Sequence, residues 1–475
     1  MNAAARSALF YASPTPAAPG APRLLLFIYN FPPDPAVGGL RWQELGRYFA
    51  GEGWAVDVVT RDFSELSGKD PQRLARLPVG VRVFCVPDRE PLVGRIQKLV
   101  WPILRRLVPQ RSSQKVDALS QREIFSQGGP RSIVRAYHAW MEFTRDSIWA
   151  GAAASLGHAV LNGEPCLAIV SSGPPHMAHE AARLAATRAG IPHVVDMRDP
   201  WSLVQRLREP IASPMWIRRA RAYESRIVSS SALVTMNTQS ARDAMRAAYP
   251  ESARKVEVIR NGSDDEPLPP ARRDGCFRIR FAGWIYMDRD PRPVFRAARR
   301  VIDQLRLTPD NLIIELVGHA NRYANTPTTQ IAEEEGVTSF VRIGGRMPRQ
   351  QTMEFLAGAT MLLSLPQDSD YAVPAKIYEY VRFPAWMLVL AMPTSATAEV
   401  LQDSDADVVD PTDVETLAAV LTMRYRQFAR GETPRPIGAD GRFDRRVQAQ
   451  RLMTLITRLV PPDDQRGESA TVSRG

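Results

Sequence analysis

The chain alternates between short apolar runs and longer stretches in which apolar residues recur every three or four positions. The short runs, rich in leucine and β-branched residues, are typical of buried parallel strands, and the longer stretches predict amphipathic helices. Strands are expected at 24–29, 54–60, 81–86, 166–171, 193–197, 231–236, 255–260, 277–282, 311–317, 340–343, 360–365, 386–391 and 406–409. Helices are expected at 40–51, 176–189, 238–248, 293–305, 349–358, 375–383, 411–429 and 444–459. This alternation predicts an α/β protein with doubly wound parallel sheets.

The elements fall into two series, which predict two Rossmann-like domains with a cleft between them. A polar, proline-rich stretch follows Asn261-Gly262, as is typical of a domain boundary. The predicted parts are a disordered leader at 1–22, an N-terminal domain at 23–262 with a basic amphipathic insert near 89–150, a C-terminal domain at 275–430, a segment at 431–462 that crosses back to the first domain, and a disordered tail at 463–475.

Composition narrows the class of protein and its compartment. With 475 residues, the chain is long enough for two or three globular domains. Its three cysteines lie far apart, which excludes a disulfide framework or a Cys-x-x-Cys metal site and fits a reducing cytoplasm. No apolar run approaches the ~20 residues that cross a bilayer, and residues 1–22 do not have the pattern of a signal peptide. We therefore expect a cytoplasmic protein.

The net charge of +10 suits phosphate-bearing ligands, an anionic membrane or nucleic acid. The arginines are dispersed and no known nucleic-acid-binding motif accompanies them, so no nucleic acid partner is expected. Residues 93–108 form a predicted helix with one apolar and one basic face, which favours an anionic membrane surface, although packing against the domain core is the alternative. A second arginine cluster, at 218–226, either extends this surface or is an ordinary solvated face.

The most informative motif begins at Pro374, directly after the apolar run 360–365. Proline at a helix start places Lys376 and Glu379 on one face of the first turn. At the carboxyl end of a strand, a lysine and a helix N-terminus suit phosphate, and a carboxylate suits ribose hydroxyls. The motif predicts a nucleotide-sugar clamp; an ordinary surface ion pair is the alternative.

Three loops of the first series carry further candidates. Gly38 and Gly39 end the loop after the first strand, where backbone N–H groups can approach a ligand, and Arg41 points toward the same place unless it is simply solvated. His176 starts a helix after a strand and could bind a sugar or diphosphate, or cap and pack instead. A third group, Asp196, Arg198 and Asp199, lies at the end of a buried strand, where it must meet a ligand or form an Asp196–Arg198 ion pair.

Four segments together resemble a GT-B glycosyltransferase of the glycosyltransferase family 4 type, in the subset that builds bacterial surface polysaccharides. They are 30–42, 171–176, 196–201 and 374–381, and the resemblance covers roughly residues 23–460. It implies a nucleotide-diphosphate donor and retention of configuration at the anomeric carbon. In this family the loop that matches Gly38, Gly39 and Arg41 faces the acceptor and the transferred sugar. Many relatives carry a His-Asp pair where this chain has Arg198-Asp199, which makes these two residues the candidates for handling the acceptor.

On the donor side, relatives present an arginine and a lysine to the diphosphate from the loop that follows Gly283. This chain supplies Arg289 and Arg292, unless neighbouring aspartates neutralise them. Glu379 matches the glutamate that holds the ribose, and Tyr371 stands where relatives have a glutamate for the sugar. No Asp-x-Asp run of the kind that metal-dependent transferases of the other main fold use is expected here, and the six histidines are scattered, so neither a metal nor another cofactor is expected.

These observations predict a cytoplasmic, metal-independent glycosyltransferase of the hexosyl- or N-acetylhexosaminyl-transferase type. It would move a sugar from a nucleotide-diphosphate sugar to a hydroxyl of a glycan acceptor, and a lipid-linked acceptor would place it on the inner face of the plasma membrane. A nucleotide-sugar 2-epimerase of the same architecture is one alternative, and it would need acid/base carboxylates and a histidine at the donor sugar. A glycan-assembly scaffold without catalytic activity is the other, because Tyr371 replaces a glutamate.

Overall fold

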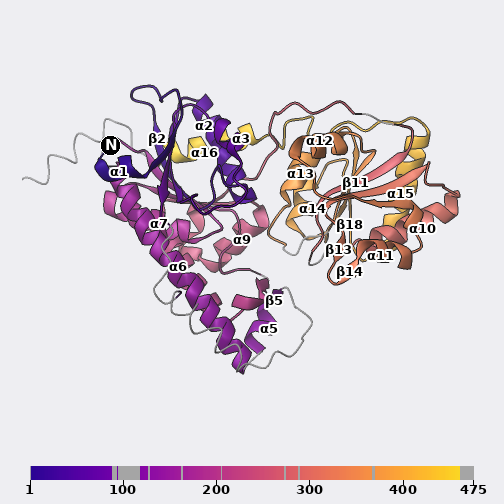
Figure 1. Cartoon of the computed structure of the whole chain (residues 1–475), viewed down its shortest axis with the longest axis horizontal. Helices are drawn as coiled ribbons and strands as arrows, with labels where there is room; N and C mark the ends of the chain where they lie inside the picture. The colour runs from indigo at the N-terminus through magenta and orange to yellow at the C-terminus, as the bar shows by residue number, and fades with distance from the viewer. Residues whose placement is uncertain are drawn as a thin grey trace, which may run out of the picture. The chain divides into compact units, whose positions relative to one another are not determined.

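The computed structural model of the chain describes residues 2–87, 94, 118–126, 129–161, 164–204, 206–271, 274–286, 289–365 and 370–459. The chain forms two compact units (Figure 1). Unit 1 comprises Met1–Arg260 and Arg446–Gly475, and unit 2 comprises Asn261–Arg445. None of the described helices combines the length and the apolar character that spanning a bilayer requires.

Unit 1 is built on an eight-stranded sheet with the order β1-β4-β3-β2-β6-β7-β9-β10. Its strands are β1 (Leu9–Ala12), β2 (Arg23–Ile28), β3 (Ala55–Arg61), β4 (Val81–Val86), β6 (Ala168–Gly173), β7 (His193–Met197), β9 (Leu233–Met236) and β10 (Val256–Val258). All pairings are parallel except that of β1 with β4. The strand order reverses at the neighbouring strands β2 and β6, which form the switch point of the sheet. Ligands of such sheets bind at the carboxyl ends of the strands beside this point.

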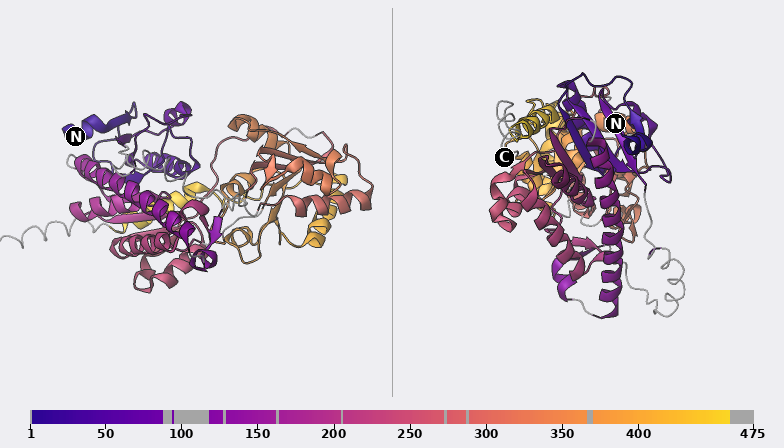
Figure 2. Two further views of the ribbon diagram at one scale, coloured as in Figure 1. Left: turned by 60° about the horizontal axis from the view of Figure 1, so that its bottom comes forward. Right: turned by 90° about the vertical axis from the view of Figure 1, so that its left-hand side faces the viewer.

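The helices of unit 1 are α1 (Ala3–Ala8), α2 (Leu40–Gly51), α3 (Pro71–Ala75), α5 (Gln121–Ser126), α6 (Pro130–Leu161), α7 (Met177–Ala189), α8 (Pro214–Ser230), α9 (Gln239–Ala248) and α16 (Arg445–Thr457). Although α16 is far from the sheet strands in sequence, its apolar residues Leu452 and Ile456 are fully buried in the core that α2 forms with β2 and β3. Burial of this apolar face attaches the C-terminal helix to the first unit. Figure 2 shows α16 in yellow among the indigo and magenta elements.

Unit 2 has a six-stranded, wholly parallel sheet with the order β15-β12-β11-β16-β17-β18. The strands are β11 (Phe277–Trp284), β12 (Leu312–His319), β15 (Val341–Ile343), β16 (Met361–Ser364), β17 (Trp386–Leu390) and β18 (Asp407–Val409). The helices are α10 (Arg292–Leu305), α11 (Thr328–Glu334), α12 (Arg349–Ala357), α13 (Ala375–Tyr380), α14 (Ala396–Leu401) and α15 (Val414–Ala429). One core joins the sheet to α10, α11 and α15, and a second joins it to α12, α13 and α14. The switch point lies between β11 and β16.

The predicted fold class is confirmed, because both sheets have the Rossmann strand order and helices cover the sheet of unit 2 on both faces. The prediction of a disordered leader at 1–22 is corrected, because residues 3–8 form α1 and the apolar strand β1 pairs with β4 and extends the sheet. Two long helices, α6 and α8, were not predicted. The tail at 463–475 and, except for Gly94, the segment 93–108 lie outside the described residues.

Candidate functional site

The loop after β2 brings its glycines close to the backbone and to Arg198. A side chain at Gly39 would approach the carbonyl oxygen of Asn30 to 2.8 Å, and one at Gly38 would lie 3.3 Å from the guanidinium of Arg198. The approach to the backbone requires glycine at position 39, whereas the Arg198 side chain could move aside for a residue at position 38. The loop and the end of β7 therefore meet at the switch point of unit 1.

Asp196, at the end of β7, is the centre of a buried hydrogen-bond network. Its carboxylate accepts hydrogen bonds from the Arg41 guanidinium, with the Nη2 donor at 2.9 Å, and from Trp42 Nε1 at 2.7 Å. The hydroxyls of Ser172 and Thr235 donate at 3.0 Å each. Burial alone would raise the pKa of Asp196, but Arg41 and the donors outweigh burial and hold it below its usual value.

This network corrects two predictions. Arg41 does not point toward a ligand, because its side chain is only 4% exposed and is bound to Asp196. The buried ion pair of the strand end is Arg41–Asp196 and not Asp196–Arg198. A pair so deeply buried positions the start of α2 against β7.

Arg198 has no bonded carboxylate among the residues that the structure describes. Its Nε donates to the carbonyl oxygen of Gly173 at 3.0 Å, and its Nη2 donates to the carbonyl oxygen of Pro174. Burial lowers the pKa of Arg198, and the nearby Asp199 opposes the shift. An arginine held by neutral carbonyl groups keeps its positive charge available at the loop of Gly38, which suits an anionic or hydroxyl-bearing ligand.

His176 packs on Trp201, with the two rings stacked at 5.0 Å, and its side chain makes no helix cap. Burial and the charge of Arg198 lower the pKa of His176 to about 3, so its ring is neutral at pH 7. Behind it, Ser171 Oγ lies 2.8 Å from His193 Nε2 and 2.9 Å from His179 Nδ1. His176 can therefore donate or accept a hydrogen bond as a neutral imidazole, but it is a poor base.

Glu224 of α8 fixes the loop that carries Asp199, and sequence patterns gave no indication of this role. Its fully buried carboxylate accepts from the backbone N–H groups of Trp201 and Ser202 at 2.6 and 2.8 Å. The hydroxyls of Ser202 and Tyr249 also donate to it, at 2.7 and 2.8 Å. Burial and this carboxylate raise the pKa of the Tyr249 phenol far above its usual value.

We expect Glu224→Gln to lower the free energy of unfolding by about 1–3 kcal/mol, because an amide nitrogen would face donors that now have an acceptor. Urea denaturation measures the change, and Glu251→Gln at an exposed position is the matched control. A loss no larger than that of the control would mean that the loop does not depend on this carboxylate.

In unit 2, Lys376 lies at the switch point between β11 and β16. Its Nζ sits 3.9 Å from the ring centre of Phe281, and a side chain at Gly283 would approach it to 2.7 Å. It makes no hydrogen bond or ion pair with any described residue. Burial, and to a smaller degree Arg289, lowers the pKa of Lys376 to about 7, while Glu379 opposes the shift. The site thus holds a desolvated ammonium group that an anion would satisfy.

The two arginines of the neighbouring loop differ. Arg289 donates to the carbonyl oxygen of Trp284 at 3.0 Å and lies close enough to Lys376 to lower the pKa of that lysine. Arg292 is held by Asp290 at 3.4 Å and by Glu334 at 3.7 Å, so carboxylates neutralise it. Arg289 is the better candidate for an anionic ligand.

Glu379 is half-buried and accepts a hydrogen bond from Arg349 at 2.9 Å. Arg349 also contacts Glu266 at 3.2 Å. The sequence predicted that Glu379 would be free to bind ribose, or would form a surface ion pair with Lys376. In the structure Glu379 is instead paired with Arg349, the first residue of α12. Gly318 was missed by sequence reasoning: its φ of 103° and the 2.4 Å that would separate a side chain from the Gly283 carbonyl oxygen require glycine.

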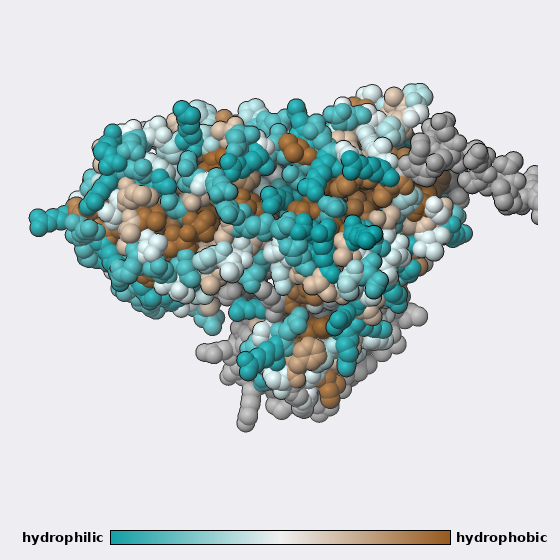
Figure 3. All heavy atoms as spheres, turned by 180° about the vertical axis from the view of Figure 1, so that it is seen from behind, coloured by the Kyte–Doolittle hydropathy of each residue, from teal (hydrophilic) through white to brown (hydrophobic). Residues whose placement is uncertain are grey.

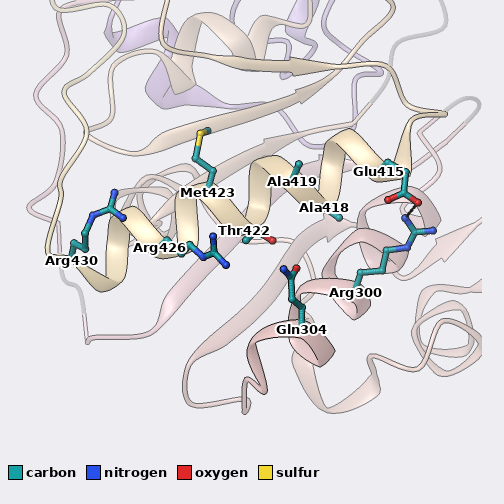
Figure 4. A pocket seen from close by; sticks show the side chains of 9 residues that line it. All are labelled: Arg300, Gln304, Glu415, Ala418, Ala419, Thr422, Met423, Arg426 and Arg430. Atoms are coloured by element: carbon teal, nitrogen blue, oxygen red, sulfur yellow. Dashed lines mark hydrogen bonds and ion pairs between the residues drawn. The ribbon is translucent and has the colours of Figure 1, made fainter.

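A separate pocket of about 560 Å³ lies between α10 and α15 (Figure 4). Its lining residues are Arg300, Gln304, Glu415, Ala418, Ala419, Thr422, Met423, Arg426 and Arg430. None of them is a predicted site residue, and Glu415 pairs with Arg300 across the pocket. Among the residues that the structure describes, no three histidine, cysteine or acidic side chains converge as metal ligands.

Comparisons with known proteins agree with the observed fold. Residues 38–262 match the family model described as glycosyl transferase 4-like domain. A glycosyltransferase from Rickettsia africae ESF-5 has a similar structure, with a TM-score of 0.58, 10% identity, and coverage of 93% of this chain and 99% of that one. Sucrose-phosphate synthase from Thermosynechococcus elongatus is similar with a TM-score of 0.57 and 13% identity, over 92% of this chain and 99% of that one. The UDP-forming α,α-trehalose-phosphate synthase from Burkholderia xenovorans is similar with a TM-score of 0.56 and 13% identity, over 93% of this chain and 100% of that one. No curated protein sequence matches the chain.

Two Rossmann-like units with cationic side chains at their switch points, together with these similarities, define the class: the chain is a GT-B glycosyltransferase. Its first unit contains a glycosyl transferase 4-like domain at residues 38–262.

Proposed function

We propose that the enzyme transfers a sugar from a nucleoside-diphosphate sugar to a hydroxyl of a lipid-linked glycan, with retention of configuration and without a metal. The observation that carries the proposal is the desolvated Lys376 at the switch point of unit 2, which has no bonded carboxylate among the described residues. A diphosphate supplies the charge that this site lacks. Arg289 would stabilise the negative charge that develops on the departing nucleotide.

The acceptor is assigned to unit 1. Arg198 and the backbone around Gly38 offer donors to a hydroxyl or phosphate group, and His176 offers a neutral imidazole. Asp199 stands beside Arg198 and is the candidate for orienting the acceptor hydroxyl. Support for the ligand classes comes from structural neighbours: one was solved with UDP-2-fluoro glucose, and another with glucose-6-phosphate.

The test incubates purified protein with labelled nucleotide sugars and a membrane extract. Label should appear in the lipid fraction, and NMR of the product should show the anomeric configuration of the donor. Activity should persist in EDTA. Interconversion of nucleotide sugars without an acceptor would favour the epimerase alternative, and binding without any product would favour the scaffold.

We further expect Glu379→Ala to weaken nucleotide binding by about 1–3 kcal/mol through loss of a charged hydrogen bond to ribose. Calorimetric titration with UDP and with other nucleoside diphosphates measures the change. Arg349→Ala distinguishes binding of ribose by Glu379 from pairing of Glu379 with Arg349, because it removes the arginine and leaves the carboxylate in place. If both variants bind with wild-type affinity, Glu379 does not contact the nucleotide.

A further inference from the structure

Helix α6 carries a second apolar face that is exposed among the described residues of unit 1. Ile133, Trp140 and Ile148 are 72%, 37% and 39% exposed, and Tyr137 lies beside Trp140 with the ring centres 6.2 Å apart. Their spacings of three, four, seven and eight residues place them along one side of the helix. The opposite side is buried and includes Phe143, which packs against aromatic residues of unit 1. A helix with two apolar faces, one of them bare, indicates a binding surface.

The bare face belongs to an arm of unit 1, which we define as residues 118–126, 129–148 and 206–211. The short strands β5 (Ala118–Ser120) and β8 (Arg206–Arg208) pair in this arm, and α5 adds Phe125, which is 58% exposed. Figures 1 and 2 show the first half of α6 extending with α5 and β5 away from the eight-stranded sheet. Figure 3 shows apolar surface on this part of the molecule among hydrophilic residues. The arm thus presents its apolar residues at a projecting position.

The arm carries a net positive charge, because its arginines outnumber its carboxylates. The carboxylates of Glu142, Asp146 and Glu209 are each paired with an arginine, and the exposed Glu123 accepts hydrogen bonds from Ser120. In contrast, Arg122 and Arg131 are exposed and form no ion pair with any described residue. Exposed apolar and aromatic side chains flanked by unpaired cations complement an anionic lipid surface, where aromatic rings sit at headgroup level and arginines meet phosphate.

We propose that the arm docks the enzyme on anionic lipid, with Phe125, Ile133 and Trp140 in the headgroup region and Arg122 and Arg131 on lipid phosphates. The inference deepens the proposed transfer to a lipid-linked acceptor and rests on it for its biological purpose. It assigns membrane contact to residues that lie within the predicted basic insert near 89–150 but outside the helix at 93–108 that the sequence favoured for the membrane.

Sedimentation with vesicles of phosphatidylglycerol and phosphatidylcholine tests the proposal on the full chain. Wild type should bind the anionic mixture and not pure phosphatidylcholine. The double variant Ile133→Glu/Trp140→Glu should lower the partition coefficient at least about tenfold, because two apolar side chains no longer enter the headgroup region. Val447→Glu on α16, at a position 51% exposed, is the matched control and should bind as wild type. The double variant Arg122→Gln/Arg131→Gln should bind the anionic vesicles more weakly than wild type, and its binding should depend less on salt concentration.

Three outcomes would overturn the proposal: no binding by wild type, equal binding by the double variant, or self-association of wild type that the double variant abolishes in the absence of lipid. The last would identify a second copy of the chain as the partner. Unchanged melting temperature confirms that the variants are folded. Calorimetry with the nucleotide donor is independent of the arm, so it distinguishes failure of docking from failure of the proposed transferase activity.

Discussion

Replacing Lys376 with methionine should weaken binding of the nucleoside-diphosphate donor by about 2–5 kcal/mol, a loss of roughly 30-fold or more, because the diphosphate would lose its desolvated cationic partner. Methionine keeps the apolar stem over Phe281, so the packing of α13 should persist. Lys376 is the only lysine of unit 2, and Lys69→Met, at an exposed position of unit 1, is the matched control. Calorimetric titration measures the affinity, and wild-type affinity in the variant would remove Lys376 from the donor site.

The same lysine predicts a pH signature. Its pKa of about 7 in the folded protein is below the ordinary value of 10.5, so the folded chain binds fewer protons than the unfolded chain between these pH values. The contribution of Lys376 to stability therefore rises as pH increases from about 7 to 10.5, and Lys376→Met should stabilise the ligand-free protein most near neutral pH. A bound diphosphate should restore the charge, so binding above pH 7 should take up a proton and weaken with rising pH. Calorimetry in buffers of different ionisation enthalpy detects that proton, and none would be taken up by the variant.

Asp196→Asn should lower the free energy of unfolding by about 3–5 kcal/mol, since it leaves the Arg41 guanidinium buried without its counter-charge. Both side chains of the pair are at most 4% exposed, so water cannot replace the lost partner. Urea denaturation measures the loss. The control is Asp243→Asn, which breaks the Arg242–Asp243 pair at an exposed carboxylate and should change stability by less than about 1 kcal/mol.

Two further results would test this account of Asp196. The folded-state pKa of Asp196 is below 3.8, so the contribution of the pair is present at neutral pH and is lost as pH falls through that lower pKa. The double variant Arg41→Met/Asp196→Leu should recover much of the stability, because an apolar pair of similar volume removes both buried charges. If Asp196→Asn behaves like Asp243→Asn, the network does not hold α2 against β7.

The alternation of apolar runs was enough to predict the strands and helices that build both sheets. This works because a strand buried on both faces must be apolar throughout, and a helix packed on a sheet must be apolar on one side. The pattern failed for α6, whose apolar residues occupy two sides of the helix: one packs on unit 1 and the other is exposed. It also failed for β1, because a short edge strand carries too few residues to distinguish it from a loop.

The sequence predicted which loops carry the candidate site residues, but not which side chains those residues pair with. Strand order brings Gly38 to Arg198 and Gly283 to Lys376, and the carboxyl ends of strands could be recognised in the sequence. The sequence could not show which arginine remains available to a ligand, because Arg41 and Arg198 are equally basic in the sequence. Arg41 is bound by Asp196, 155 residues away, whereas the described hydrogen-bond partners of Arg198 are carbonyl groups.

The sequence by itself determined the fold class, the loops that bear chemistry and the resemblance to family 4 glycosyltransferases, because local periodicity and short motifs depend on neighbours along the chain. Only the tertiary structure decided that Arg41 is a buried structural residue, that Lys376 is a desolvated cation and that α6 has an uncovered face. Burial and ion pairing are set by residues far apart in sequence, and their energies change steeply over a few ångströms that only the packed sheet and helices define.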